Sequence, residues 1–118
     1  GEASYTWQLD NPENKAFVEG IMAKTGNVPT SNEQNAYTLC KVFLAALEAT
    51  GGDDSYAAMW PAITALQMDT PAGKLSFESC GVAVTDMFIT QAEQAEDGTY
   101  QLSAPIAEVP QIRDWRIK

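Results

Sequence analysis

The clearest pattern of apolar and polar positions lies between Ser31 and Gly51 and predicts one long helix. Ser31 and Gln34 have the spacing of a capping box, in which the two side chains bond backbone amides of the first turn. Thr50-Gly51-Gly52 predicts the end of the helix, because glycine readily adopts the left-handed conformation found there. Apolar residues recur at helical spacing between these ends, at Ala36, Leu39, Cys40, Phe43, Leu44 and Leu47.

The apolar face of this helix is unusually wide. Tyr37, Val42 and Ala46 extend it, and the polar strip that remains contains Thr38, Lys41, Ala45 and Glu48. A helix with so much apolar surface needs cover on more than one side. Burying one Leu or Phe side chain stabilises a protein by about 1.5 to 3 kcal/mol. We therefore predict that the isolated chain self-associates, through this face or through a shared strand edge.

Two shorter helices flank the long one. Asn11 is the expected N-cap of the first, which has proline and glutamate in its first turn and ends at Gly26. Asp53, Asp54 and Ser55 each offer an N-cap for the third, which is expected to run toward Leu66. Pro61 is predicted to kink this third helix or to divide it, because proline removes a backbone donor. The apolar face of the first helix consists of Phe17, Val18, Ile21 and Met22.

The second half of the chain changes to the alternating pattern of strands. Turn residues at 69–73 precede a short predicted strand at Lys74–Glu78. Glu96-Asp97-Gly98 predicts a hairpin turn between strands at 86–95 and 99–103. The prolines that follow break the pattern and leave residues 111–118 as a tail. On this reading the chain is α+β, with three helices followed by a short strand and a β-hairpin.

Composition limits the possible functions. The 118 residues fit one domain, and 7 basic against 16 acidic residues give a net charge of −9, which repels nucleic acid phosphates. The chain has no histidine, which excludes histidine-based catalysis and histidine metal ligands. The paired acids Asp53-Asp54 and Glu96-Asp97 fit a helix cap and a turn. We therefore predict no enzyme activity, no metal site and no cofactor.

The two cysteines, Cys40 and Cys80, are far apart in the sequence and form no metal-binding motif. Cys40 lies on the apolar face of the long helix and is predicted to be a small buried thiol, whereas Cys80 lies in a predicted loop. A disulfide needs Cα atoms within about 7 Å. We predict that the two thiols are not bridged to each other.

Several segments in a particular order resemble a known family. They are NPENKAFV at 11–18, Ala36-Tyr37 in the long helix, DTPAG at 69–73 before a strand, and an Asp-Gly hairpin followed by tyrosine. Their order and separations resemble those of the type I periplasmic solute-binding proteins of the branched-chain amino acid ABC transporter group. The resemblance extends from Tyr5 to Leu102 and corresponds to the C-terminal portion, about the last third, of a member.

The resemblance implies an α/β fold with two lobes that close on a small solute. Residues 1–118 would then be a single segment of the C-terminal part. Residues of about 11–78 would belong to the first lobe, residues of about 84–104 would form a closing hairpin toward the second lobe, and 105–118 would be a tail. The first lobe's sheet would cover the long helix in the complete protein.

The same resemblance implies which residues face the solute. Tyr5 and Trp7 lie in the segment that approaches the hinge, and Asn32, Gln34 and Tyr37 lie on the first turns of the long helix. Each has a structural alternative. The alternative for Asn32 and Gln34 is a capping role, for Tyr37 it is helix packing, and for Trp7 it is that of a half-buried aromatic.

The function implied is that of an extracytoplasmic solute-binding component of an ATP-driven importer. Its ligand would be a small amino acid-like or carboxylate solute, and its partner would be a membrane permease. The protein itself would lie in the periplasm or another extracytoplasmic compartment. Two alternatives remain open. One is a ligand-sensing regulator on the same scaffold, and the other is an independent small interaction domain.

Overall fold

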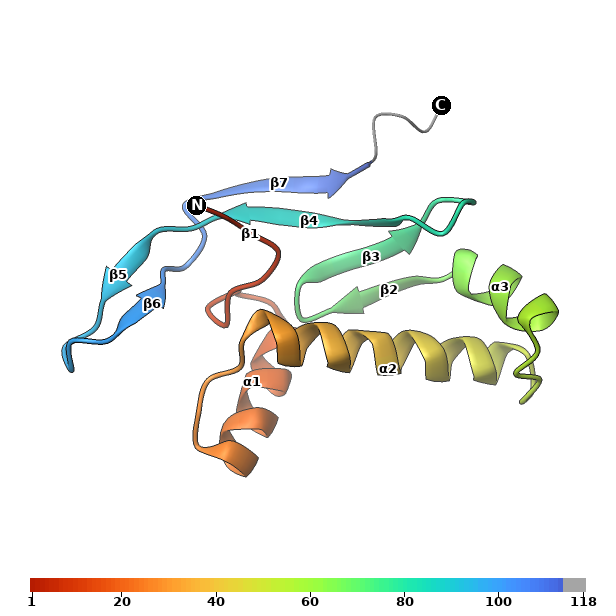
Figure 1. Ribbon diagram of the computed structural model, residues 1–118, viewed down its shortest axis with the longest axis horizontal. Coiled ribbons are helices and arrows are strands. Elements are labelled where there is room, and N and C mark those ends of the chain that lie inside the picture. The colour runs from red at the N-terminus through yellow and green to blue at the C-terminus, as the bar shows by residue number, and fades with distance from the viewer. Residues whose placement is uncertain (114–118) are drawn as a thin grey trace.

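The computed structural model describes residues 1–113 and shows three helices on one side of a set of antiparallel strands (Figure 1). This arrangement confirms the α+β reading of the chain. The elements are, in chain order, β1 (Glu2–Ala3), α1 (Pro12–Thr25), α2 (Ser31–Ala49), α3 (Tyr56–Thr64), β2 (Gln67–Thr70), β3 (Gly73–Phe77), β4 (Ala83–Ile89), β5 (Ala92–Gln94), β6 (Tyr100–Leu102) and β7 (Ala107–Ile112).

Strand β4 is the centre of the larger sheet. Along one edge it pairs first with β3, where Ser76 lies opposite Val84, and then with β1, where Ala3 lies opposite Phe88. Strand β7 also pairs with β4, and β2 extends the sheet beyond β3. Strands β5 and β6 form a separate two-stranded sheet that projects away from the rest (Figure 1). The chain therefore has one main sheet and one outlying hairpin.

Helix α1 begins and ends where the sequence predicts. The side chain of Asn11 accepts a hydrogen bond from the Asn14 amide, Pro12 is the first helical residue, and Gly26 ends the helix with a φ of 74°. Phe17, the aromatic residue of α1, lies on the inward face of the helix and is part of the core. That core consists of Tyr5, Leu9, Phe17, Ala72 and Phe88.

The predicted capping box of α2 is wrong by one residue. The N-cap is Thr30, and the Glu33 carboxylate accepts a hydrogen bond from the Thr30 amide at 2.9 Å. Ser31 is already helical. The reason is that threonine and glutamate also have the three-residue spacing of a capping box, one position earlier than the predicted pair. The predicted end is confirmed, because Gly51 and Gly52 both have positive φ.

The apolar face of α2 that was predicted to need cover is largely exposed. Leu39 is 68% exposed, Phe43 is 50% exposed and Leu44 is 61% exposed. The buried residues of the helix are Gln34, Val42 and Ala46. Cys40 lies on the exposed face, so the prediction of a buried thiol is wrong, whereas both cysteines are free, as expected. The physical reason is that residues 1–113 supply a sheet for only one side of this helix.

Helix α3 is continuous through Pro61, so the predicted division of this helix is wrong. The Ala65 amide donates to the Pro61 carbonyl, and the hydrogen-bond ladder therefore resumes directly after the proline. The Ser55 side chain caps the helix, as predicted. The aromatic ring of Trp60 packs against Gly81 in the β3–β4 loop, where a Cβ atom would lie only 2.5 Å from the ring.

Two strands were not predicted, and one predicted strand is divided. Strand β2 occupies part of the segment read as a turn, and β7 occupies part of the predicted tail. The strand expected at 86–95 is split between β4 and β5, which belong to different sheets. Strand β7 tolerates Pro110 because the pairing with β4 shifts register there. Residues 114–118 of the predicted tail lie outside the described residues.

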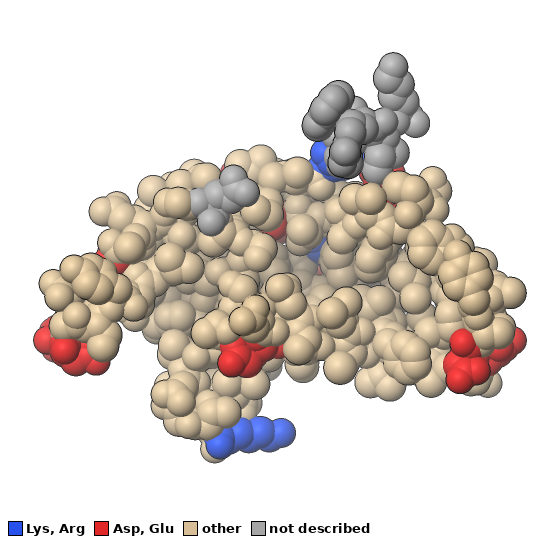
Figure 2. Space-filling model, in the orientation of Figure 1, with Lys and Arg blue, Asp and Glu red and all other residues tan. Residues whose placement is uncertain are grey.

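The folded chain exposes more surface than a compact protein of its length. Its accessible area is 7730 Å², whereas a compact monomer of this size exposes about 6,300 Å². Its radius of gyration is 16.0 Å, compared with about 13.5 Å for a compact domain. Acidic groups are dispersed over the face shown in Figure 2. Within residues 1–113, no helix has the length and apolar character needed to cross a bilayer.

Candidate functional site

Three segments that are distant in the sequence meet around one small pocket. They are the segment after β1, the connector between α1 and α2, and strand β6. The pocket has a volume of about 220 Å³. We call it the junction pocket. Its lining residues are Tyr5, Thr6, Trp7, Val28, Pro29, Thr30, Ser31, Tyr100, Gln101 and Leu102.

Tyr5 attaches the segment after β1 to helix α1. Its hydroxyl donates to Asn14 Oδ1 at 2.8 Å, and its ring meets the Phe17 ring edge-on with centroids 6.2 Å apart. The side-chain amide of Asn14 in turn donates to the carbonyls of Trp7 and Leu9. Burial, with a smaller contribution from the charge of Glu33, raises the pKa of Tyr5 well above its ordinary value. The Tyr5 hydroxyl is therefore a neutral structural donor.

The outlying hairpin is held against the same segment by two hydrogen bonds. Thr6 Oγ1 donates to the Ser103 carbonyl at 3.2 Å, and Gln8 Nε2 donates to the Leu102 carbonyl at 2.8 Å. Thr6 and Ser103 are both buried. These bonds keep Tyr100 and Leu102 on the far side of the pocket from Tyr5. The position of the hairpin thus determines how wide the pocket is.

Trp7 lies between two hollows. It lines the junction pocket and also a groove of about 640 Å³ beside α1, where Val18 and Met22 are its neighbours. Its indole N–H is buried and has no acceptor among the described residues. A buried donor without an acceptor costs free energy, by about 1 to 3 kcal/mol. Trp7 is therefore the lining residue with an unused hydrogen-bonding group.

The other three predicted site residues lie elsewhere. Gln34 is buried, donates to Thr38 Oγ1 at 2.8 Å, and lines a separate groove of about 320 Å³ between α2 and the sheet. The Tyr37 ring packs against Phe17 with centroids 4.8 Å apart, which is a contact between α1 and α2. Asn32 is exposed and lines neither hollow. The structure thus brings together Tyr5 and Trp7 but not the helix residues.

Sequence reasoning missed the part of the pocket that comes from the connector and the hairpin. Val28 and Pro29 were read only as a linker, and Leu102 only as a hairpin strand residue. Tyr100 was noted for its position after the Asp-Gly turn, which is the one signal that pointed to it. Their proximity to Tyr5 depends on the long-range bonds between the hairpin and the first segment, which a local pattern does not reveal.

The lining of the junction pocket is neutral. It contains aromatic rings, aliphatic groups, hydroxyls and one amide, and no Lys, Arg, Asp or Glu. Such a surface binds apolar or aromatic parts of a ligand and offers a few hydrogen bonds. Its volume is below the roughly 300 to 1,000 Å³ of pockets that enclose a ligand. Residues 1–113 contain no group of acidic or cysteine side chains placed to hold a metal ion.

Comparison with known proteins identifies the class to which this fold belongs. The sequence profile of the periplasmic binding protein family matches residues 2–99. The chain therefore belongs to the periplasmic binding protein family. The members and structural neighbours found are described as binding proteins rather than as enzymes.

The relatives are much longer than this chain. Leu/Ile/Val-binding protein homolog 6 of Brucella abortus is 29% identical over 99 residues, which cover 81% of this chain and 25% of the relative. An ABC transporter substrate-binding protein from Sphaerobacter thermophilus is 29% identical and superposes with a TM-score of 0.84 over 94% of this chain and 30% of that one. The chain thus spans about a quarter of the curated relatives.

A second solved structure supports the fold alone. It is a solute-binding protein of an ABC transporter from Rhodopseudomonas palustris BisB5, in complex with 3,4-dihydroxybenzoic acid. It is 20% identical, and the match has a TM-score of 0.86 over 96% of this chain and 31% of that protein. The two-lobed family fold expected from the sequence is therefore confirmed, with this chain as an α+β part of it.

Proposed function

We propose that this chain is part of an extracytoplasmic solute-binding component of an ATP-driven importer, and that its junction pocket is one wall of the solute cleft. The observation that supports this proposal is the convergence of three distant segments on a neutral, aromatic pocket in a chain of the periplasmic binding protein family. The small volume of the pocket fits a wall that needs a facing surface to enclose a ligand.

The division of the chain between two lobes is part of the same proposal. Residues of about 11–78 belong to the first lobe, and residues of about 84–104 include the hairpin that reaches toward the second. The break between β4 and β5 supports this division, because the chain leaves one sheet there and enters another. The junction pocket lies where these two parts meet.

Each predicted site residue has a role in the proposal. Tyr5 and Trp7 form the wall: Trp7 offers its indole face, and the buried Tyr5 fixes the segment that carries it through the bond to Asn14. Asn32 is exposed at the start of α2 and contacts the solute from that side when the lobes close. Tyr37 holds α2 against α1 through its packing on Phe17, and the buried Gln34 bonds Thr38 on the next turn of α2.

The solute that we propose is a small amino acid-like or carboxylate molecule. Named relatives bind related compounds: one is called a Leu/Ile/Val-binding protein homologue and others are in complex with benzoate or hydroxybenzoates. The neutral lining receives the aliphatic or aromatic part of such a solute, and the facing wall binds its charged groups. The partner of the loaded protein is a membrane permease.

The test uses the whole protein encoded by the reading frame that contains this chain. Its melting temperature is measured with a panel of aliphatic amino acids and aromatic carboxylates, and affinities are then measured by calorimetry. We expect a saturable ligand, with Trp7→Ala weakening its binding about tenfold or more, because aromatic contacts dominate binding energy.

Trp60→Ala is the matched control, since Trp60 packs on Gly81 and does not line the pocket. It should leave the affinity unchanged. If no member of the panel raises the melting temperature, or if both variants weaken binding equally, the proposed wall is wrong.

A further inference from the structure

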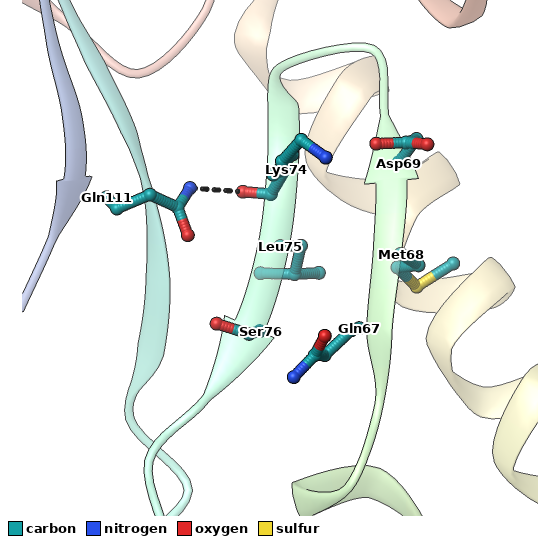
Figure 3. Close-up of a pocket in the computed structure, with 7 residues that line it drawn as sticks. All are labelled: Gln67, Met68, Asp69, Lys74, Leu75, Ser76 and Gln111. Carbon is teal, nitrogen blue, oxygen red and sulfur yellow. Dashed lines mark hydrogen bonds between the residues drawn. The ribbon is translucent and has the colours of Figure 1, made fainter.

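Another hollow lies on the β2–β3 hairpin, and it shares no lining residue with the junction pocket (Figure 3). Its volume is about 360 Å³, within the roughly 300 to 1,000 Å³ of small-molecule sites. Polar side chains of both hairpin strands and of β7 surround it. They are Gln67, Asp69, Lys74, Ser76 and Gln111.

The hollow contains one positive and one negative group that do not neutralise each other. Asp69 and Lys74 are directly opposite in the strand register. Within residues 1–113, the three ion pairs are elsewhere, and neither of these two charged groups makes a hydrogen bond. Gln67 and Ser76 are also opposite each other and have no side-chain hydrogen bonds there. Two rows of polar groups, one charged and one neutral, are thus available to a ligand.

The fifth side chain, that of Gln111, is held rigidly at the rim. Asp86 Oδ1 accepts from the Gln111 amide at 2.8 Å and from Gln111 Nε2 at 2.9 Å, and Nε2 also donates to the Lys74 carbonyl at 3.1 Å. Gln111 has a φ of 50°, the one positive value of a non-glycine residue in the described chain. Residues held in this conformation occur preferentially at functional sites.

Buried groups beneath the hollow fix this geometry. Asp86 is 8% exposed, and its Oδ2 would lie 2.3 Å from a Cβ atom on Gly73, so only glycine fits at that position. Asp86 thus orients Gln111, and Gly73 makes room for Asp86. The Gln111 amide oxygen makes no hydrogen bond in the described chain and remains free to accept one from a ligand.

From this geometry we infer a binding site for a small zwitterion with a neutral hydrogen-bonding tail. The Lys74 ammonium binds the carboxylate and the Asp69 carboxylate binds the ammonium group of the ligand. Gln67, Ser76 and the Gln111 amide oxygen bond the tail. The site requires both ligand charges. A ligand with only a negative charge is repelled by Asp69 and by the net charge of −9 of the chain. A ligand with only a positive charge is repelled by Lys74. The inference is independent of the proposed solute cleft.

The test is a titration of the ¹⁵N-labelled full chain, followed by amide chemical shifts. The probe is L-glutamine, and the comparison probes are N-acetyl-L-glutamine, which lacks the ammonium charge, and L-glutaminamide, which lacks the carboxylate. We expect saturable shifts in β2, β3 and at Gln111 with L-glutamine. Both comparison probes should bind up to about fivefold more weakly, since an exposed charge contact contributes up to about 1 kcal/mol.

Variants identify the charged partners. Asp69→Asn and Lys74→Met should each weaken L-glutamine binding about fivefold, whereas the double exchange Asp69→Lys with Lys74→Asp should restore part of it. Glu19→Gln and Lys24→Met on the exposed surface of α1 are the matched controls and should have no effect. The exchange variant keeps the test valid if a single variant folds poorly.

Three results would overturn the site. One is the absence of saturable shifts in the hairpin with L-glutamine. Another is equal binding of the three probes, which would mean that the two charges do not act as partners. Shifts confined to Tyr5–Trp7 and Tyr100–Leu102 would also overturn it, and would instead support the proposed cleft wall.

Discussion

Helices α1 and α2 both have an apolar face that the sequence identifies, but they use that face differently. On α1 the aromatic residue Phe17 is 5% exposed and packs between Tyr5 and Tyr37. On α2 the aromatic residue Phe43 is 50% exposed, and its apolar neighbours are exposed with it. Helical spacing therefore shows which residues need cover, but it does not show whether the same chain supplies the cover.

The difference comes from what lies beside each helix. The segment after β1 folds back over α1 and is held there by Asn14, whose amide bonds two of its carbonyls. Helix α2 has the sheet along one side, where Val42 and Ala46 are buried. Its opposite side faces solvent, in a chain that exposes roughly 1,400 Å² more than a compact monomer.

The largest expected effect concerns the two phenylalanines. Phe17→Ala should destabilise the chain by about 3 to 5 kcal/mol, because it empties a buried site. Phe43→Ala should change the free energy of unfolding by no more than about 0.5 kcal/mol, as exposed substitutions usually do. Urea unfolding followed by circular dichroism measures both, at a concentration low enough for the chain to be monomeric. Equal losses there would mean that other residues of the same chain cover the α2 face.

The second prediction concerns that cover. We expect the isolated chain to self-associate through the exposed face of α2. Leu39→Gln or Leu44→Gln should weaken this association about tenfold or more, because burying a Leu side chain contributes about 1.5 to 3 kcal/mol. Sedimentation equilibrium measures the association. Ile106→Gln is the control, because Ile106 is similarly exposed but follows β6. A monomer at high micromolar concentration would contradict the prediction.

A smaller effect is expected at the polar contact that fixes α1. Tyr5→Phe removes the hydroxyl that donates to Asn14 Oδ1 and leaves this buried acceptor without a donor. The expected cost is about 1 to 3 kcal/mol. Thr25→Val, which removes an exposed hydroxyl bond at the other end of the same helix, should cost less. A negligible loss for Tyr5→Phe would show that water replaces the hydroxyl.

The same residue predicts a dependence on pH. The pKa of Tyr5 is raised in the folded chain, first by burial and then by Glu33. Above a pH of about 10 the unfolded chain therefore loses this proton while the folded chain keeps it, so stability falls as the pH rises. Unfolding measured between neutral and alkaline pH should show a smaller fall in the Tyr5→Phe variant. An identical fall in stability in both proteins would mean that other titrating groups cause it.

The smallest effect tests the start of α2. Thr30→Ala should destabilise the chain by about 1 kcal/mol, because it removes the N-cap hydroxyl. Ser31→Ala should have almost no effect, because Ser31 is a helical residue. Thermal unfolding of the two variants, side by side, measures the difference. A larger loss of stability for Ser31→Ala would mean that Ser31 is the N-cap, as the sequence first indicated.

Local signals predicted the helices well and the strands less well. Asn11 and Gly26 bound α1 because capping and left-handed glycine are properties of a few neighbouring residues. Strand β7 was missed because Pro110 is unfavourable in a strand, and its pairing depends on the distant residue Asp86, which bonds Gln111. No pattern within six residues contains that information.

The candidate site shows the same limit. Tyr5 and Trp7 were identified through a family resemblance, and the structure places both in the junction pocket. The helix residues Gln34 and Tyr37 were assigned to the cleft by the same resemblance, but a helix turns successive residues in different directions, and these two face other elements. Tyr100 and Leu102 reach the pocket only because the hairpin is hydrogen-bonded to Gln8 and Thr6.

The position of β4 has a consequence for the order in which the chain folds. Two of its three partners, β1 and β7, come from the beginning and the end of the described sequence, whereas the helices and the β2–β3 hairpin form through near neighbours. Contacts between distant residues form late, because closing a long loop costs more entropy. During synthesis, β4 therefore emerges from the ribosome before the strand that pairs with its far edge. In that interval its unpaired edge can pair with a strand of another molecule, so slow translation of the β5–β7 region should increase aggregation of this chain.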